Sequence, residues 1–543
     1  MLSLVLTLAC IALIIVLLVV FKRPADVAGI IGLVVIAAVA MLFFSTSFEV
    51  VARSTIAGLI KSFSVSLIVA TSLLQMALME KSGALKRIII FIKTIASDNK
   101  AVQIMLINIG FGTLMVAVGA TPVSLLPPIL LAMGYTTYVA IALPAIGYDS
   151  LCTYALLGAP IVVFLDMANG FLKAHPAIAG GALLSLSQVG QVFAYFLPLT
   201  SIMIGFAMLW IAGRWQGVKK GILPVLVTGA VIGLISYFTS KFDNLVVLTG
   251  VFCGIGVIIA MVCYLKVTGK KVIDKAILTK EELEYEKKYP LLKALSPWLL
   301  LIGIILVLNV PKPIFDFLYR TNTFPITGLT ADGSPIATRF LWNAYTWILV
   351  STILSLIFLR PTKQQLKDTC KTWLKRAPRP VFAAAIFFAI GEVMNMSGYN
   401  MITKAPNVDS MMTVLANYSA SAFQSAYGAI ASFIGLLGGF ITGSEASTIA
   451  MFSKYSMATA TSTTLNLGLT GMIIVTAGLA FGSGLASVIS PAKLQNAAAS
   501  IDKLGEEHKV IKTAFVFSLI FTIVTAGFVM LLLKVLPPDF IHF

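Results

Sequence analysis

Long apolar runs separated by short charged segments make up most of the chain. The run at 1–21 carries no charged residue. At 1.5 Å per residue it is long enough to cross a hydrocarbon core of about 30 Å as a helix. Similar runs lie at 221–240, 244–265, 294–311 and 340–359. This pattern predicts an all-α polytopic membrane protein with about 12 transmembrane helices.

The composition narrows the class of protein further. Hydrophobic residues make up 59% of the chain and charged residues 11%, whereas soluble domains are about 25% charged. This excludes a water-soluble globule and a disordered chain. The formal net charge of +17 fits cationic cytoplasmic loops better than a nucleic-acid partner, because no basic aromatic module accompanies it. The five cysteines lack metal-ligand or disulfide spacing, so we expect no metal site and no cofactor.

The distribution of basic residues predicts the topology. Lys and Arg cluster in four loops, at 80–100, 214–220, 266–293 and 360–379. By the positive-inside rule, we expect these loops to face the cytoplasm. The intervening segments 241–243 and 311–339 carry few basic residues, and we expect them to face outward.

Two apolar regions are interrupted by Gly and Pro. Region 101–148 has no charged residue, and region 425–492 has only Glu445 and Lys454. Non-helical backbone at membrane depth is tolerated only where protein buries it or where it lines a wet cavity. We therefore expect re-entrant hairpins near 101–134 and 425–457, each followed by a broken helix. The breaks are predicted at 147–160 and from 481–484 to Pro491.

The order span, hairpin, broken span, span occurs twice, in opposite orientations. Such inverted repeats are typical of a secondary transporter with its site near the midplane, here of elevator-like architecture. The predicted parts are N-terminal scaffold helices at 1–53, a first repeat at 54–213, central scaffold helices and cytoplasmic loops at 214–379, and a second inverted repeat at 380–543. The scaffold helices are the candidate interface of a homodimer.

The hairpin tips can bind an anion without any Arg, because a helix N-terminus carries about +0.5 charge and exposed N–H groups. Small residues at the tips and breaks can supply further donors. The candidate substrate-binding residues are Gly119, Thr121, Ser124, Gly158, Thr442, Gly443, Ser444, Ser447, Thr448 and Ser490. The alternative is that these small residues only allow close packing of membrane helices.

Three acidic residues fall within the apolar regions: Glu445, Asp149 and Glu392. A carboxyl group at membrane depth can hold and release a proton near neutral pH, so these are the candidate proton-coupling residues. The alternative is a structural carboxylate that caps N–H groups or pairs with Lys454. Lys61 is expected to snorkel to an interface, and Asp166 is expected to be solvated.

An enzyme is not expected. The serine in 482–484 has no deep His base or Asp partner, as an intramembrane protease would need. No phosphate-binding loop occurs in the cytoplasmic segments, which disfavours ATP-driven transport.

The interrupted segments resemble those of the L-lactate permease family of bacterial and archaeal carriers. Residues 433–445 read FIGLLGGFITGSE, similar to that family's FIGxLGxFxxGS-acidic signature, and 489–491 read ISP. In the first half, 119–124, 131–135 and 158–161 are similar to family elements in order and spacing. The resemblance implies a lactate or glycolate carrier driven by proton symport.

The sequence therefore predicts a multi-pass transporter of the cytoplasmic membrane. It would import a small organic anion, L-lactate or a related 2-hydroxymonocarboxylate such as glycolate, together with a proton. Its partners would be that anion, the proton and the lipid bilayer, with no nucleic acid. A sodium-coupled carboxylate transporter and a passive organic-anion channel remain as alternatives.

Overall fold

The computed structural model describes residues 1–543 except 22, 97, 121, 490–492, 495–496, 499 and 504–505. The described chain is mostly helical, and its strands form two short antiparallel pairs, β1 with β2 and β3 with β4. Eleven of its helices are long and apolar enough to cross a membrane. The twelfth crossing stays a prediction.

The elements follow one another along the chain in three stretches. The first comprises α1 (Leu2–Val19), α2 (Ala25–Phe43), α3 (Phe48–Lys61), α4 (Phe63–Lys81), α5 (Ala84–Lys93), α6 (Lys100–Ile104), the π-helix η1 (Met105–Phe111), α7 (Gly112–Ala117), α8 (Pro122–Ala132), α9 (Thr137–Gly147), η2 (Tyr148–Tyr154) and α10 (Ala155–Ala174). The second comprises η3 (Pro176–Ile178), α11 (Leu186–Thr239), α12 (Asp243–Val246), α13 (Thr249–Val267), η4 (Lys275–Ile277), α14 (Lys280–Lys288), α15 (Leu291–Asn309), α16 (Lys312–Phe315), η5 (Asp316–Thr321), β1 (Pro325–Ile326), β2 (Ile336–Ala337) and α17 (Ala344–Leu359). The third comprises α18 (Lys363–Arg376), α19 (Pro378–Met396), β3 (Tyr399–Asn400), β4 (Ala405–Pro406), α20 (Met411–Phe423), η6 (Gln424–Ala426), α21 (Tyr427–Thr442), α22 (Glu445–Ala460), α23 (Gly468–Ala486), η7 (Ser487–Ile489) and α25 (Glu507–Val535).

The longest helix, α11, is two helices joined at a kink. Arg214 has φ 50° and ψ −149°, outside the helical region. The kink falls within the predicted loop 214–220, between two apolar stretches that each match a predicted span.

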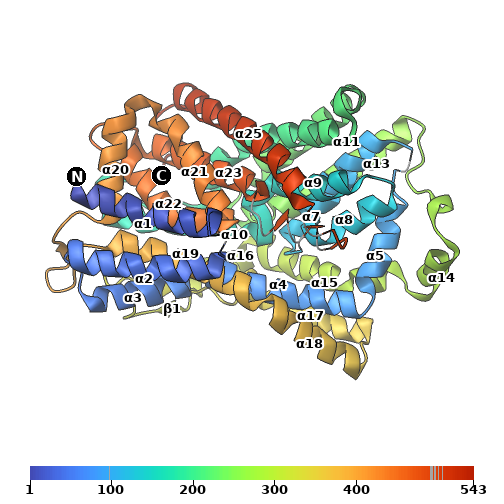
Figure 1. Ribbon diagram of the computed structural model, residues 1–543, viewed down its shortest axis with the longest axis horizontal. Helices are drawn as coiled ribbons and strands as arrows, with labels where there is room; N and C mark the ends of the chain where they lie inside the picture. Colours follow the sequence, from blue (N-terminus) through green and yellow to red (C-terminus); the bar gives the residue numbers. More distant parts are fainter. Residues whose placement is uncertain are drawn as a thin grey trace.

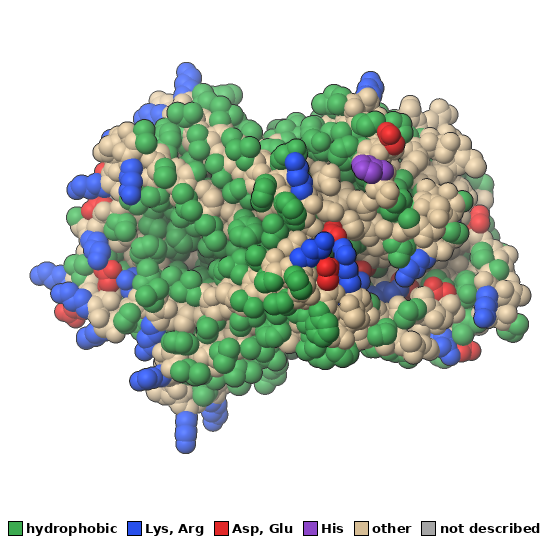
Figure 2. All heavy atoms as spheres, turned by 180° about the vertical axis from the view of Figure 1, so that it is seen from behind, with side chains coloured by type: hydrophobic (Ala, Val, Ile, Leu, Met, Phe, Trp, Pro, Cys, Tyr) green, Lys and Arg blue, Asp and Glu red, His purple; other side chains and the backbone are tan. Residues whose placement is uncertain are grey.

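The outer surface of the helices is unusually apolar. Val34 and Leu42 on α2, and Phe515 and Ile523 on α25, are large exposed hydrophobic side chains. Figure 2 shows hydrophobic side chains covering most of the middle of one face, while many Lys and Arg gather along its left edge. An exposed apolar surface of this extent is stable only when a nonpolar solvent covers it, as lipid does.

Three of the four basic loops contact one another. Lys93 pairs with Glu282 at 3.0 Å, and Arg87 pairs with Glu286 at 3.0 Å, which joins α5 to α14. Arg376, at the end of α18, pairs with Glu80 at 2.6 Å. These helices lie at the right of Figure 1, with α14 at the edge. The loops that the positive-inside rule assigns to one side of the membrane are thus neighbours in space.

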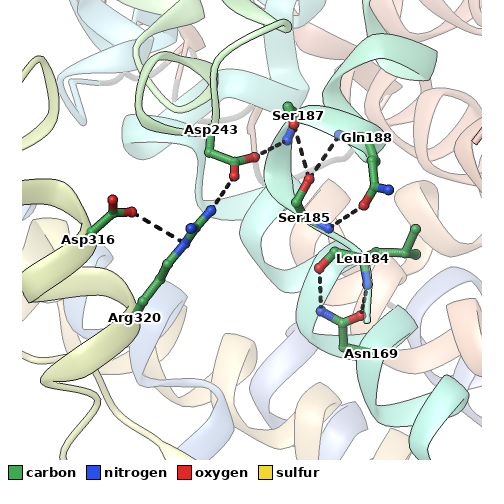
Figure 3. Close-up of polar contacts among 8 residues, drawn as sticks. All are labelled: Asn169, Leu184, Ser185, Ser187, Gln188, Asp243, Asp316 and Arg320. Atoms are coloured by element: carbon green, nitrogen blue, oxygen red, sulfur yellow. Dashed lines mark hydrogen bonds and ion pairs between the residues drawn. The ribbon is translucent and has the colours of Figure 1, made fainter. Parts of the chain in front are cut away.

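The segments expected to face outward form a second set of contacts (Figure 3). The Asp243 carboxylate accepts a hydrogen bond from the Ser187 backbone N–H at 2.6 Å and pairs with Arg320. Asp166, expected to be solvated, is 40% exposed and also pairs with Arg339 at 3.1 Å. These bonds join α10, the start of α11 and the start of α12 to the 311–339 segment.

Candidate functional site

The first candidate element is the interruption between α9 and α10. The chain passes from α9 into the 3-10 helix η2, where Leu151 is non-helical, and then through three left-handed residues. Leu156, Leu157 and Gly158 have φ values of 53°, 56° and 76°. A non-glycine residue held in this region costs about 1–3 kcal/mol, and such strain clusters at functional sites. The predicted interruption at 147–160 is confirmed.

The second candidate element is the turn between α21 and α22. Gly443 ends α21 with φ 65°, and Ser444 begins the next helix as its N-cap, accepting a bond from the Ser447 N–H at 3.3 Å. The Thr442 and Thr448 hydroxyls lie 3.0 Å apart, and both bond to the Ser444 carbonyl. The turn is therefore held by its own polar side chains.

One hydroxyl of the turn is not used in this way. Ser447 is 1% exposed, and its Oγ has no hydrogen-bond partner among the described residues. A buried hydroxyl without a partner costs free energy, so it is suited to bind a polar group that arrives there.

The two interrupted elements meet at Glu445, the first residue of α22. This side chain is 3% exposed, and its Oε1 accepts a hydrogen bond from the Thr153 hydroxyl of η2 at 2.7 Å. A Cβ atom on Gly484 of α23 would lie 2.7 Å from Glu445 Oε2. Helices α10, α22 and α23 lie side by side left of centre in Figure 1. The Glu445 carboxylate is thus enclosed by segments from both halves of the chain.

A second buried acid, Glu392 of α19, lies near Lys454 of α22. Glu392 of α19 is paired with Lys61, the last residue of α3, at 2.6 Å. Its other carboxylate oxygen lies 3.9 Å from Lys454 Nζ of α22. Lys61, expected to snorkel to an interface, instead pairs with a buried acid, and the acid that Lys454 approaches is Glu392. We call these three residues the lysine cluster.

The start of the break predicted from 481–484 to Pro491 is wrong, because helix α23 continues to Ala486. The 3-10 helix η7 then follows at Ser487–Ile489, and residues 490–491 lie outside the described part of the chain. A Cβ on Gly435 of α21 would collide with the Leu479 carbonyl, and one on Gly482 would collide with the Ser432 carbonyl. Glycine at these positions allows the backbones of α21 and α23 to approach closely. Here the small residues serve the close packing of membrane helices, which was the alternative to a binding role. Likewise, 101–117 is helical throughout, and Gly110 falls in the π-helical turn η1.

Of the remaining predicted site residues, the structure describes Gly119 in full, some only in part and others not at all. Gly119 has φ 88°, and a Cβ there would lie 3.6 Å from Leu156, so the first turn adjoins the α10 interruption. Asp149 belongs to η2, but its side chain, like that of Ser124, is outside the described part of the structure. Thr121 and Ser490 lie outside the described residues altogether. Sequence reasoning missed Thr153, although it lies between the predicted Asp149 and Gly158.

A small cavity of about 20 Å³ borders the interruption between α9 and α10, lined in part by Leu156, Leu157 and Ser64. Its two asparagines already have partners: Asn309 Oδ1 accepts a bond from Trp342 Nε1 at 3.1 Å, and Asn343 Nδ2 donates to the Thr338 carbonyl at 2.8 Å. No charged residue lines it. The ionisable chemistry therefore lies at Glu445 and at the lysine cluster.

Apolar spanning helices, a strained interruption and buried acids between helices are typical of a multi-pass membrane transporter. The family model described as L-lactate permease matches residues 3–536, so the chain belongs to the L-lactate permease family. It is a protein of the cell membrane, and membership of a permease family makes it a transporter rather than an enzyme. The resemblance found in 433–445 is confirmed.

Individual relatives are distant but cover most of the chain. The L-lactate permease of Salmonella typhi is 22% identical over 519 residues, covering 90% of this chain and 88% of that protein. Glycolate permease GlcA of Escherichia coli is 23% identical over 462 residues, covering 78% and 77%. The crystal structure of the Alcanivorax borkumensis YdaH transporter matches with a TM-score of 0.44 and 9% identity, covering 89% of this chain and 87% of that chain.

Proposed function

We propose that this protein imports L-lactate or a related 2-hydroxymonocarboxylate such as glycolate by proton symport. The observation that carries the proposal is the Glu445 carboxylate, buried at the start of α22 and hydrogen-bonded to Thr153 in the interruption of the other half. The printed functions of the permease relatives supply the substrate class.

Proton and anion binding would be cooperative at this place. The start of α22 offers backbone N–H groups and a positive helix end, which favour a carboxylate. An ionised Glu445 beside that carboxylate would repel it, whereas a protonated Glu445 would not. Each ligand therefore raises the affinity for the other, as a symporter requires.

The order of elements supports two inverted repeats. The first repeat would comprise α4 and α5, the hairpin at 100–132, and then α9, η2, α10 and α11. The second would comprise, in the same order, α19 and α20, the hairpin α21 and α22, and then α23, η7 and α25. The hairpins would enter from opposite sides, and the two repeats would move against the remaining helices as in an elevator.

Contacts at the hairpin bases support the opposite orientations. At the first base, the Tyr135 hydroxyl donates a hydrogen bond to Gln103 Oε1, and Gln103 Nε2 donates one to the Ile95 carbonyl. Ile95 also forms an antiparallel β-bridge with Ile273 of the basic loop 266–293. At the second base, the Leu467 N–H bonds the Ala460 carbonyl, and α23 begins beside Ile541 near the segments expected to face outward. The remaining predicted ligands, Thr121, Ser124 and Ser490 among them, stay predictions, as do a role for Asp149 and a homodimer.

Uptake of labelled L-lactate into proteoliposomes tests the proposal. An inward proton gradient should drive accumulation, and collapsing the gradient should abolish it. Dependence on Na⁺ rather than H⁺, measured by replacing sodium with choline, would favour the sodium-coupled alternative. Absence of saturable counterflow would favour a channel.

A further inference from the structure

The lysine cluster places two ammonium groups on one buried carboxylate. The side chains of Lys61, Glu392 and Lys454 are 23%, 9% and 16% exposed. The Glu392 carboxylate is held closely by Lys61 at 2.6 Å and only loosely by Lys454 at 3.9 Å. The other nearby carboxylate, Asp332, acts on them electrostatically but forms no ion pair with either lysine among the described residues. A poorly solvated ammonium group that is only loosely paired is costly, so Lys454 is suited to bind an anion.

The cluster is distinct from the site at Glu445. Lys454 follows Glu445 by nine residues on α22, which corresponds to about 14 Å along the helix. It lies six residues before the end of α22 at Ala460, next to the base of the second hairpin. Gly170 of α10 adjoins it, since a Cβ there would lie 3.9 Å from Lys454 Cε.

The charged neighbours of Glu392 come from three elements. Lys61 is on α3, Lys454 is on α22, and Asp332 of the 311–339 segment acts electrostatically on Glu392 and on Lys454. Within the described chain these are the charged groups that act on Glu392. Asp332 lies on a segment expected to face outward, so the cluster adjoins the side from which an imported anion arrives.

We propose that the lysine cluster is a loading site for the substrate carboxylate, in which the substrate and the ionised Glu392 compete for Lys61 and Lys454. This inference rests on the proposed function and extends it. When Glu392 takes up a proton, its carboxyl group no longer holds Lys61, and the substrate carboxylate replaces it. Binding of the proton and the substrate carboxylate together leaves the net charge of the cluster unchanged. Binding of either one alone changes that charge, which is costly in a low-dielectric place.

Substrate affinity and its pH dependence test the proposal. In the wild-type protein, the KM for L-lactate should be lower at about pH 5.5 than at about pH 7.5, because acid removes the competing carboxylate. Glu392→Gln should lower the KM at about pH 7.5 toward its value at about pH 5.5 and leave only the pH dependence that Glu445 contributes, while uptake persists. Lys454→Gln should raise the KM about tenfold or more, and Lys454→Arg should restore most of the affinity.

Matched controls separate this role from general charge effects. Glu49 and Lys404 are exposed, and Glu49→Gln and Lys404→Gln should keep the wild-type KM at each pH. Because a stranded buried charge can prevent folding, the double variant Lys61→Gln/Glu392→Gln is tested beside the single ones. L-Lactate binding to the purified, monodisperse protein is measured by calorimetry.

The outcomes distinguish this proposal from the proposed function. If the wild-type protein shows proton-driven uptake but Glu392→Gln keeps the wild-type pH dependence of KM, the loading site is refuted and symport stands. An unchanged KM in Lys454→Gln refutes it as well. If the wild-type protein neither binds nor transports L-lactate, both proposals fail.

Discussion

The Thr153 hydroxyl donates a 2.7 Å hydrogen bond to Glu445, across 292 residues of sequence. Thr153 lies in the strained interruption before α10, and Glu445 begins α22. A bond to a buried carboxylate is stronger than one between neutral groups. It couples the geometry of one interrupted element to the charge of the other.

Removing this hydroxyl should impair transport while leaving the fold intact. Thr153→Val keeps the shape of the side chain but removes the donor to Glu445. A hydrogen bond to a charged group contributes about 1.5–3 kcal/mol, so its loss should cost about that much. We expect the initial rate of L-lactate uptake to fall about tenfold or more. Thr153→Ser, which keeps the hydroxyl, should retain most of the rate. Equal rates in the Val and wild-type proteins would show that the bond has no role.

Crowding Glu445 from α23 should have a similar effect. In Gly484→Ala the new methyl group would lie 2.7 Å from Glu445 Oε2, so the carboxylate must move. Overpacking of this kind costs about 1–3 kcal/mol, and we expect proton-driven uptake to drop several-fold. Gly527→Ala on α25 is the matched control, because nothing lies within 4 Å of its Cβ position. A rate in Gly484→Ala as high as in this control would contradict the role of Glu445.

The docking of α14 should resist moderate acid. Burial alone would raise the pKa of Glu282, but hydrogen bonds from the Thr279 N–H and from Lys93 hold it below its ordinary value of 4.5. A carboxyl with a depressed folded pKa stabilises the fold above its unfolded pKa, and this contribution is lost as pH falls through the folded pKa. The α14 amides should therefore stay protected from hydrogen exchange down to pH 4.5 and lose protection only below it.

Lys93→Gln is the corresponding variant. It removes the ammonium group beside Glu282, so the α14 amides should exchange faster at neutral pH. Protection that is equal in the variant and wild-type proteins would show that the ion pair does not hold α14.

The topology can be read by cysteine labelling. With the exposed Cys263 and Cys370 replaced by Ser, Thr327→Cys in the 311–339 segment should react with a membrane-impermeant maleimide in intact cells. Glu281→Cys on α14 should react only after permeabilisation. The reverse pattern would overturn the orientation predicted from the basic loops.

The spans, the basic loops and an acid within an apolar region at Glu445 could be predicted from the sequence because each depends on neighbouring residues only. Apolar length and loop charge need no knowledge of distant contacts. The pairing of Lys61 with Glu392 spans 331 residues, and no spacing rule contains it. Glycines at 481–484 could mark either a break or close packing, and only the position of α21 decides between the two. Thr153 was missed because a lone threonine gains its role only from the acid placed opposite it.

The behaviour of Glu445→Gln in proteoliposomes tests most directly whether Glu445 carries the coupled proton. This variant resembles the protonated acid, so it should still exchange labelled for unlabelled L-lactate while failing to accumulate L-lactate under an inward proton gradient. Accumulation equal to that of the wild-type protein under the same gradient would contradict the proposal that Glu445 carries the coupled proton.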